Sequence, residues 1–167
     1  VLLFIGKLSA QNISLPQPDK SEKMTLMEAL ESRSTDRNFS EEDIDMQTLS
    51  NLLWAAWGYN RENKRTAPSS QEKQVISLYV VMKTGAYLYD AKTNVLQQVN
   101  TLDVRNKMGK QDFVSVAPIN IAFVADQSKN GDPMRDCGYI SQNIYLYCAA
   151  KNLATVARGY YDEKEVH

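Results

Sequence analysis

Residues 75–99 read VISLYVVMKTGAYLYDAKTNVLQQV, and this stretch decides the fold class. From Val75 to Met82 the side chains are β-branched and aromatic, which predicts a strand. Residues 87–89 and 95–99 flank the turn-rich stretch Asp90 to Asn94, and this arrangement predicts a hairpin. The middle of the chain is therefore expected to form a sheet.

Downstream of the hairpin, the sequence predicts one more strand and one long helix. Asn120 to Asp126 is nearly all apolar, which predicts a strand in the centre of the sheet. Asp132-Pro133 is an N-cap followed by proline at the first helical position, and the helix should continue to about Lys151. Because the apolar residues of this helix lie on several of its faces, we expect most of these faces to be buried. Gly138 in its first half predicts close approach of another backbone.

Two helices are expected before the sheet. Thr25 and Glu28 match a capping box, which predicts a short helix that ends near Ser32. A second helix is expected between the N-cap Asp45 and Gly58. One of its faces carries four apolar residues, namely Leu49, Leu52, Leu53 and Ala56.

The remaining segments complete the order of elements. Arg61 to Lys73 is expected to be a polar loop. Leu153 to Ala157 predicts a last short strand, which Gly159 ends. Helices and strands thus alternate in an α+β or α/β order.

Length and composition restrict the class of protein. A chain of 167 residues can build one domain with a core, and it is too short for two comfortable ones. With 43% hydrophobic and 23% charged residues, the composition is that of an ordinary soluble protein. The net charge of −1 and the lack of a basic stripe argue against nucleic-acid binding. We expect an apolar start and Pro-rich linker over 1–23 and a folded domain over 24–167.

The first residues have two interpretations. Val1 to Ile5 is apolar and small residues follow it, as in the end of a secretory signal that lacks its basic start. This interpretation favours an exported or periplasmic protein, and otherwise the chain would be cytoplasmic. The alternative is a buried N-terminal strand or an addition from cloning. The run is too short to span a bilayer.

Several kinds of chemistry lack the residues they need. The only histidine is His167, so a Ser-His-Asp triad or a Cys-His pair has no credible base. Metal sites built on histidine or clustered cysteine are equally short of ligands. Cys137 and Cys148 fall in one expected helix, about 16 Å apart at the standard rise, which is too far for a disulfide. No phosphate-binding P-loop or GxGxxG pattern is present. An enzyme with this sequence would therefore depend on a cofactor.

The stretch Arg33-Ser34-Thr35-Asp36-Arg37 could hold the phosphate of such a cofactor. Two guanidinium groups match phosphate oxygens, and the hydroxyls between them can complete the contacts. Composition alone leaves an exposed Arg/Ser turn as the alternative.

The same stretch resembles the opening motif of the nitroreductase family. In that motif an arginine, a serine, a basic residue and a phenylalanine alternate with other residues, and Arg33, Thr35 (for serine), Arg37 and Phe39 match it. Residues 49–61 resemble the helix that follows, and 65–70 resemble the second flavin-contacting loop. The resemblance continues in order through 78–81, 85–90, 117–118 and 136–143. SagB-type and exported nitroreductases are the most similar by pattern.

The resemblance implies an α+β, nitroreductase-like fold, in which helices flank a central, mostly antiparallel sheet. It also implies a homodimer that holds FMN and takes NADH or NADPH as co-substrate. The expected function is hydride transfer through the flavin to a small nitro, quinone or similar acceptor, by a ping-pong mechanism. No side chain is expected to be catalytic. The implied cofactor contacts are Arg33, Ser34, Thr35, Arg37, Pro68, Ser69, Ser70, Glu72, Gln74, Arg158 and Gly159.

Three departures from the family pattern leave alternatives open. Glu72 stands where relatives usually carry asparagine, and Arg158 stands where many carry glutamate or glycine. The chain also ends at His167, and we expect it to lack the C-terminal strand of its relatives. The alternatives are an azoline-oxidising, SagB-like member, a non-catalytic member, or a small-molecule-binding domain that has lost flavin.

Overall fold

The structure is a computed structural model that describes residues 11–162. Its central feature is a five-stranded sheet with the order β1-β6-β5-β4-β7, in which all neighbouring strands are antiparallel. The strands of this sheet are β1 (Ile13–Ser14), β4 (Ile76–Met82), β5 (Gly85–Asp90), β6 (Val95–Asn100) and β7 (Ile119–Ala125). The predicted antiparallel sheet is therefore confirmed.

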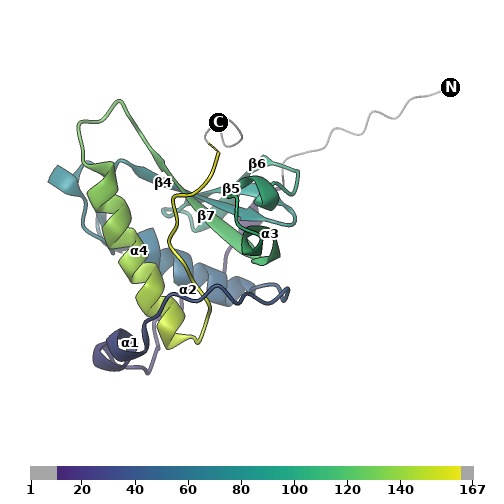
Figure 1. The fold of residues 1–167 in the computed structure, drawn as a ribbon. Coiled ribbons are helices and arrows are strands. Elements are labelled where there is room, and N and C mark those ends of the chain that lie inside the picture. The colour runs from purple at the N-terminus through teal and green to yellow at the C-terminus, as the bar shows by residue number, and fades with distance from the viewer. Residues whose placement is uncertain (1–10, 163–167) are drawn as a thin grey trace.

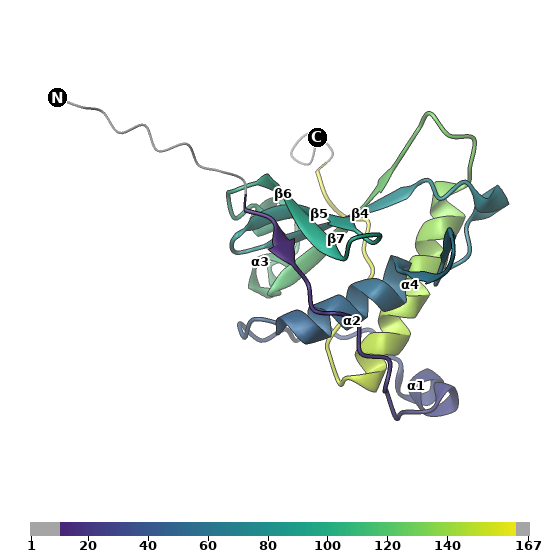
Figure 2. The same cartoon turned by 180° about the vertical axis from the view of Figure 1, so that it is seen from behind.

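Helices α2 and α4 lie along one side of this sheet, and α1 lies against one end of α4 (Figures 1 and 2). The α-helices are α1 (Leu26–Ser32), α2 (Met46–Trp57), α3 (Phe113–Val116) and α4 (Pro133–Ala150). Two short 3-10 turns complete the helical elements, namely η1 (Ser70–Glu72) and η2 (Arg105–Lys107). The predicted α+β class is confirmed.

All three predicted helix starts are present. The Thr25 side chain accepts a hydrogen bond from the Glu28 N–H, and the Glu28 carboxylate accepts one from the Thr25 N–H at 2.7 Å. Asp45 caps α2 by accepting from the Thr48 N–H at 2.9 Å. Asp132 caps α4 in the same way. These contacts satisfy N–H groups that the first turn of a helix leaves without partners.

The predicted hairpin is β5 and β6, in which Asp90 pairs with Val95 and Leu88 pairs with Gln97. The Asp90 carboxylate accepts the Lys92 N–H at 2.9 Å and so stabilises the turn. Gly85 begins β5 with φ 133°, a value that side-chain-bearing residues rarely adopt. A Cβ there would lie 2.2 Å from the Asn100 carbonyl oxygen, so this position requires glycine.

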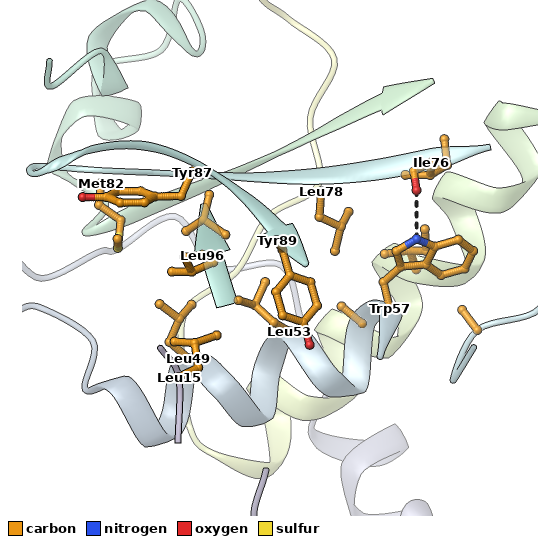
Figure 3. Packing of buried hydrophobic residues seen from close by; sticks show 14 of the residues in the cluster. Leu15, Leu49, Leu53, Trp57, Ile76, Leu78, Met82, Tyr87, Tyr89 and Leu96 are labelled. Carbon is orange, nitrogen blue, oxygen red and sulfur yellow. Dashed lines mark hydrogen bonds between the residues drawn. The ribbon is translucent and has the colours of Figure 1, made fainter. Parts of the chain in front are cut away.

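The hydrophobic core fills the space between the sheet and α2 (Figure 3). Leu49 and Leu53 of α2 are fully buried against Leu78 of β4 and Leu96 of β6. The Trp57 indole N–H donates to the Ile76 carbonyl at 2.9 Å, which joins the end of α2 to the start of β4. Burial of each large apolar side chain contributes about 1.5–3 kcal/mol. This packing fixes α2 beneath the sheet.

The predicted central position of residues 120–126 is wrong. β7 lies at one edge of the described sheet and pairs only with β4. Ile121 and Phe123 pack on the core, whereas Val124 on the other face is 48% exposed. Its core-facing Ile121 and Phe123 are only half-buried, so the apolar composition of this strand does not indicate a central position.

Two local predictions about the loops are also wrong. Residues 153–157 form no strand, since their described backbone hydrogen bonds run from the Leu153 N–H to the Cys148 carbonyl at the end of α4 and from the Asp36 N–H to the Thr155 carbonyl at 3.0 Å. A strand needs a ladder of such bonds along a neighbour. Conversely, the predicted polar loop 61–73 overlaps the small hairpin of β2 (Tyr59–Arg61) and β3 (Lys64–Arg65).

The long helix α4 is less buried than its composition predicts. Of its 18 residues, only Asp136, Ile140 and Cys148 are buried, and Met134 is 80% exposed. Gly138 is exposed, and a Cβ there would meet no atom within 4 Å, so no described backbone approaches it. The predicted separation of Cys137 and Cys148 is confirmed, because both are free thiols.

The predictions about Val1 to Ile5 lie outside the described residues. Within residues 11–162, none of the helices has the length and hydropathy that crossing a bilayer would need.

Candidate functional site

Tyr145, in the second half of α4, is the contact point of two segments that are distant in the sequence. The first is the arginine segment, residues 33–37, and the second is the tail segment, residues 153–162. The Tyr145 hydroxyl lies 3.1 Å from Thr35 Oγ1, and it accepts the Ala157 N–H at 2.9 Å. The structure therefore places the predicted phosphate contacts beside the residues that precede Arg158.

The arginine segment has cationic groups without acidic partners. The Arg33 guanidinium lies over the Tyr145 ring at 5.4 Å from its centroid, and Arg37 is exposed. Among residues 11–162, no carboxylate forms an ion pair with either arginine. The nearest acidic residue in sequence, Asp36, instead accepts both the backbone N–H and the side-chain amide of Asn38.

Two exposed hydroxyl groups, those of Ser34 and Thr35, lie in the same segment. Guanidinium groups without acidic partners, next to hydroxyl donors, suit an anion with several oxygens. The arginine segment therefore fits a phosphate group.

The second group of predicted residues lies in the proline-serine loop, residues 68–74. The Ser70 N–H donates to Asp136 Oδ1 at 2.7 Å, which holds the loop against the first half of α4. Ser69 Oγ accepts the Gln74 N–H at 3.2 Å, and Pro68 is exposed. The loop is thus supported at its centre by one buried carboxylate.

Three residues of the proline-serine loop have left-handed backbones without being glycine. Gln71, Glu72 and Gln74 have φ values of 49°, 59° and 47°. Such conformations cost about 1 kcal/mol or more each for residues with a Cβ, and they concentrate at functional sites. The conformational free energy spent here is typical of a loop that is held in one shape to bind a ligand.

The charge of Glu72 is compensated within the chain. Its carboxylate forms an ion pair with Lys64 of β3, and hydrogen bonding from Lys64 lowers the pKa of Glu72 below its usual value. Gln74 also contacts the hairpin, since its side chain accepts from Arg65 Nε at 2.9 Å and donates to the Asn63 carbonyl at 2.8 Å. The β2–β3 hairpin therefore supports this end of the loop.

Arg158 is directed away from solvent and into the molecule. Its half-buried guanidinium donates to the Met108 carbonyl and to Asn120 Oδ1, the latter at 2.5 Å. Burial lowers the pKa of Arg158, although a guanidinium stays charged at neutral pH. The next residue, Gly159, is exposed. Arg158 thus fixes the tail segment on the residues that precede and begin β7.

One chain does not bring all the predicted residues together. The proline-serine loop contacts α4 at Asp136, and the arginine segment contacts it at Tyr145. These positions are about 13 Å apart along the helix axis at the standard rise. In Figure 1 the teal loop lies beside one end of α4, and α1 with the segment after it lies beside the other.

Sequence reasoning missed two residues of this arrangement. Asp136 is fully buried, and its Oδ2 has no hydrogen-bond partner among the described residues. Tyr145 was overlooked because the apolar spacing of α4 directs attention to Ile144 and Tyr147. A polar-tipped aromatic residue beside that apolar stripe was the available signal.

Two other features do not coincide with the predicted site. A hollow of about 540 Å³ lies between the N-terminal linker, α2 and the β2–β3 hairpin, with Lys20, Trp54 and Arg61 in its lining, and it contains none of the predicted contacts. The predicted contacts lie instead in the hydrogen-bonded segments around α4. Within residues 11–162, no cluster of three potential metal ligands occurs.

Comparisons with known proteins identify the family of the chain. The family model described as "Nitroreductase family" matches residues 30–167. A candidate nitroreductase of Methanocaldococcus jannaschii is 24% identical over 165 residues, which cover 87% of this chain and 83% of that protein.

Solved structures share the fold. A candidate nitroreductase of Ralstonia eutropha JMP134 has a TM-score of 0.86 and 36% identity, over 93% of this chain and 79% of that chain. A second, from Anabaena variabilis, has a TM-score of 0.73 and 18% identity, over 91% of this chain and 36% of that chain, and it supports the fold alone. On these matches, the chain belongs to the nitroreductase family, a family of oxidoreductases.

Proposed function

We propose that the chain is an FMN-dependent oxidoreductase that acts on a small nitro, quinone or similar acceptor and uses NADH or NADPH as co-substrate. The observation that carries this proposal is the arginine segment. Its two guanidinium groups have no acidic partner among residues 11–162, and it is held against the tail segment. The family membership of the chain supports the same chemistry.

Arg33, Arg37, Ser34 and Thr35 would hold the phosphate of FMN. Arginine presents two parallel N–H donors to phosphate oxygens, and such charge-assisted bonds are about twice as strong as neutral ones. Thr35 would add a hydroxyl whose position is fixed by its contact with Tyr145. These residues would set the affinity for the cofactor.

The tail segment would contact the flavin ring through its backbone. Ala157 already donates its N–H to Tyr145, whereas no described acceptor takes the N–H of Arg158 or Gly159. A backbone N–H directed at the ring would stabilise the negative charge of reduced flavin. The guanidinium of Arg158 would hold this part of the backbone in place through Asn120 and the Met108 carbonyl.

Pro68, Ser69 and Ser70 would line the flavin ring, with Glu72 and Gln74 nearby. Glu72 differs from the asparagine that is usual in relatives, and a free carboxylate would repel reduced flavin. The ion pair with Lys64 compensates that charge, so Glu72 is compatible with a bound flavin.

The cofactor would supply the redox chemistry. Bound FMN would supply hydride transfer from NADH or NADPH to the acceptor, with the two substrates using the same pocket in turn. The protein would bind, orient and stabilise, and we assign no side chain as nucleophile or general acid.

We also propose that the protein is a homodimer with the flavin at its interface. Within one chain, the arginine segment and the proline-serine loop lie at separate places on α4. Helix α1 exposes Leu26 (63%) and Met27 (72%), and α4 exposes Met134 (80%). A second copy that covers these apolar side chains would remove them from water and could complete the site. Light scattering of the purified protein tests this proposal, and a monomer that binds FMN would contradict it.

The function is tested with the double variant Arg33→Ala/Arg37→Ala. Each lost hydrogen bond to a charged group costs about 1.5–3 kcal/mol, so the Kd for FMN should rise at least about a hundredfold. Fluorescence titration with FMN measures this change. Lys92→Ala/Lys129→Ala is the control, because it removes the same charge from exposed positions outside the site.

The wild-type protein should be yellow and should bleach with NADH or NADPH. Unchanged FMN affinity in a folded Arg33→Ala/Arg37→Ala variant would reject the proposed phosphate contacts. Colourless wild-type protein that takes up no added FMN would favour a binding domain that has lost flavin.

A further inference from the structure

The contacts of Tyr145 join the two ends of the proposed cofactor site through a single side chain. Its hydroxyl lies 3.1 Å from Thr35 Oγ1 and accepts the Ala157 N–H at 2.9 Å, while its ring supports the Arg33 guanidinium. Thr35 and Ala157 are separated by more than a hundred residues in the sequence, yet one phenolic oxygen contacts both. We propose that Tyr145 is a positioning residue that couples the phosphate contacts to the backbone beside the flavin ring.

This inference rests on the proposed binding of FMN. It goes beyond it by assigning a role to a residue that would not itself have to touch the cofactor. The role is to fix the arginine segment and the tail segment relative to one another, so that phosphate and ring are held at the same time. Contacts that are already ordered in the free protein raise the affinity for FMN, because fewer side chains and loops lose conformational freedom on binding.

The direction of the hydrogen bonds supports the coupling. A backbone N–H can only donate, so the Tyr145 oxygen acts as acceptor toward Ala157. The hydroxyl has one hydrogen of its own, which Thr35 Oγ1 can accept. When it does, the Thr35 hydroxyl hydrogen is left to point at an anion. The same arrangement that orders Ala157 thus prepares Thr35 to donate to a phosphate oxygen.

The ring of Tyr145 also helps to position the arginine segment. The Arg33 guanidinium lies over its face, and this contact limits the positions that the flexible arginine side chain can take. The hydroxyl and the ring therefore act on different residues of the arginine segment, and they can be separated by mutation.

Other contacts keep the surrounding structure in place when the hydroxyl is removed. The Asp36 N–H donates to the Thr155 carbonyl, and Arg158 donates to Asn120. Tyr145→Phe should therefore loosen Ala157 and Thr35 locally without unfolding the chain. A role in packing alone would depend on the ring, which this variant retains.

Tyr147 provides a matched control on the same helix. It lies two positions further along α4, and its hydroxyl donates to the Thr48 carbonyl of α2 at 3.4 Å. Tyr147→Phe removes a similar phenolic hydroxyl from the same helix, but on the side that faces α2. Any effect that is specific to the cofactor site should be absent in this variant.

The experiment compares wild type, Tyr145→Phe and Tyr147→Phe with FMN. Loss of one or two hydrogen bonds should raise the Kd of Tyr145→Phe for oxidised FMN about tenfold, measured by fluorescence titration. Less ordered N–H donors beside the ring should weaken binding of reduced relative to oxidised FMN, on the order of tenfold. For a two-electron couple this is a midpoint potential about 30 mV more negative. Tyr147→Phe should stay within about twofold of wild type.

Thr35→Val provides a second variant on an exposed residue, so that the test does not depend on one mutant alone. In the double variant, the loss of FMN affinity should be smaller than the sum of the two single losses, because both changes break the Tyr145–Thr35 contact. Additive effects, or a Tyr145→Phe protein that behaves like Tyr147→Phe, would overturn the inference and leave the proposed function standing. Wild-type protein that takes up no FMN would overturn both.

Discussion

Between the sheet and α2, Leu53, Leu78 and Leu96 are at most 1% exposed, whereas Thr35, Ala157 and Gly159 near the second half of α4 are exposed. The first region is held by apolar burial over many contacts (Figure 3). The second is held by a few polar contacts, chiefly those of Tyr145 and the Asp36–Thr155 backbone bond.

This difference separates stability from binding. Burial of apolar area is the dominant favourable term in folding, so the core under the sheet determines whether the chain folds. A hydrogen bond contributes only about 0.5–1.5 kcal/mol net, so the segments around Tyr145 contribute little to overall stability. Their value lies in presenting donors to a ligand. Variants in the two regions should therefore have different consequences.

Leu53→Ala should have the largest effect on stability. Leu53 has no exposed surface, and removing it leaves a cavity between α2 and the sheet, at a cost of about 2–5 kcal/mol. Urea denaturation at a fixed protein concentration measures the loss. The Kd for FMN of the fraction that remains folded should be unchanged. A loss below about 1 kcal/mol in the free energy of unfolding would contradict the separation of folding stability from FMN binding. An equal loss of FMN affinity would contradict it as well.

Trp57→Phe should have an intermediate effect. The change removes the indole N–H that donates to the Ile76 carbonyl and also reduces the volume of a side chain that is 2% exposed. We expect a loss of about 1–3 kcal/mol in the free energy of unfolding. Trp54→Phe is the control, since Trp54 is half-buried and its indole donates to the Tyr59 carbonyl at the edge of the core. Equal losses in the two variants would show that burial does not set the cost.

Alkaline pH should weaken the core. Burial raises the pKa of the Cys148 thiol from 9.0 to about 11 and that of Tyr89 from 10.0 to about 12. Between these values the unfolded chain releases protons that the folded chain retains. Stability is therefore complete below about pH 9 and decreases as the pH rises toward 11 and 12.

Denaturation midpoints measured from pH 8 to 11 test this trend. Cys148→Ala should have a shallower decrease than wild type, whatever its stability at neutral pH. If the denaturation midpoint falls with pH equally steeply in both proteins, the Cys148 thiol does not contribute to the loss of stability at alkaline pH.

Gln71→Gly should have the smallest effect, and it should be favourable. Gln71 has φ 49° in the proline-serine loop, where glycine is not strained. Relief of about 1 kcal/mol is partly offset by the greater freedom of glycine in the unfolded chain, so the net gain should be below about 1 kcal/mol. Thermal denaturation measures it, with Gln97→Gly in β6 as a control that should destabilise. A destabilised Gln71→Gly variant would show that the loop is not under strain.

Elements with local causes were predicted well from the sequence. The three helix starts depend on side chains that hydrogen-bond within three residues of themselves, as Thr25, Asp45 and Asp132 do. The hairpin of β5 and β6 depends on a short turn around Asp90. The resemblance to the nitroreductase family identified the fold in the same way, from ordered motifs, and the family is confirmed.

Elements with distant partners were predicted poorly. Whether residues 119–125 lie at the centre or the edge of a sheet depends on which strands flank them, and β7 has only β4. Residues 153–157 have an extended composition, but their described backbone partners are single bonds to Cys148 and Asp36 and not a neighbouring strand. The exposure of Gly138 likewise depends on which segments of the chain approach α4.

By itself the sequence determined the helix caps, the hairpin, the buried face of α2 and the arginine segment as a candidate for binding phosphate. The tertiary structure alone decided that Tyr145 contacts both Thr35 and Ala157, and that Asp136 supports the proline-serine loop. The physical reason is the distance in sequence between the residues that interact. Capping and turn signals act between neighbours in the chain, whereas the Tyr145 contact joins residues 110 positions apart, which only the packing of α4 brings together.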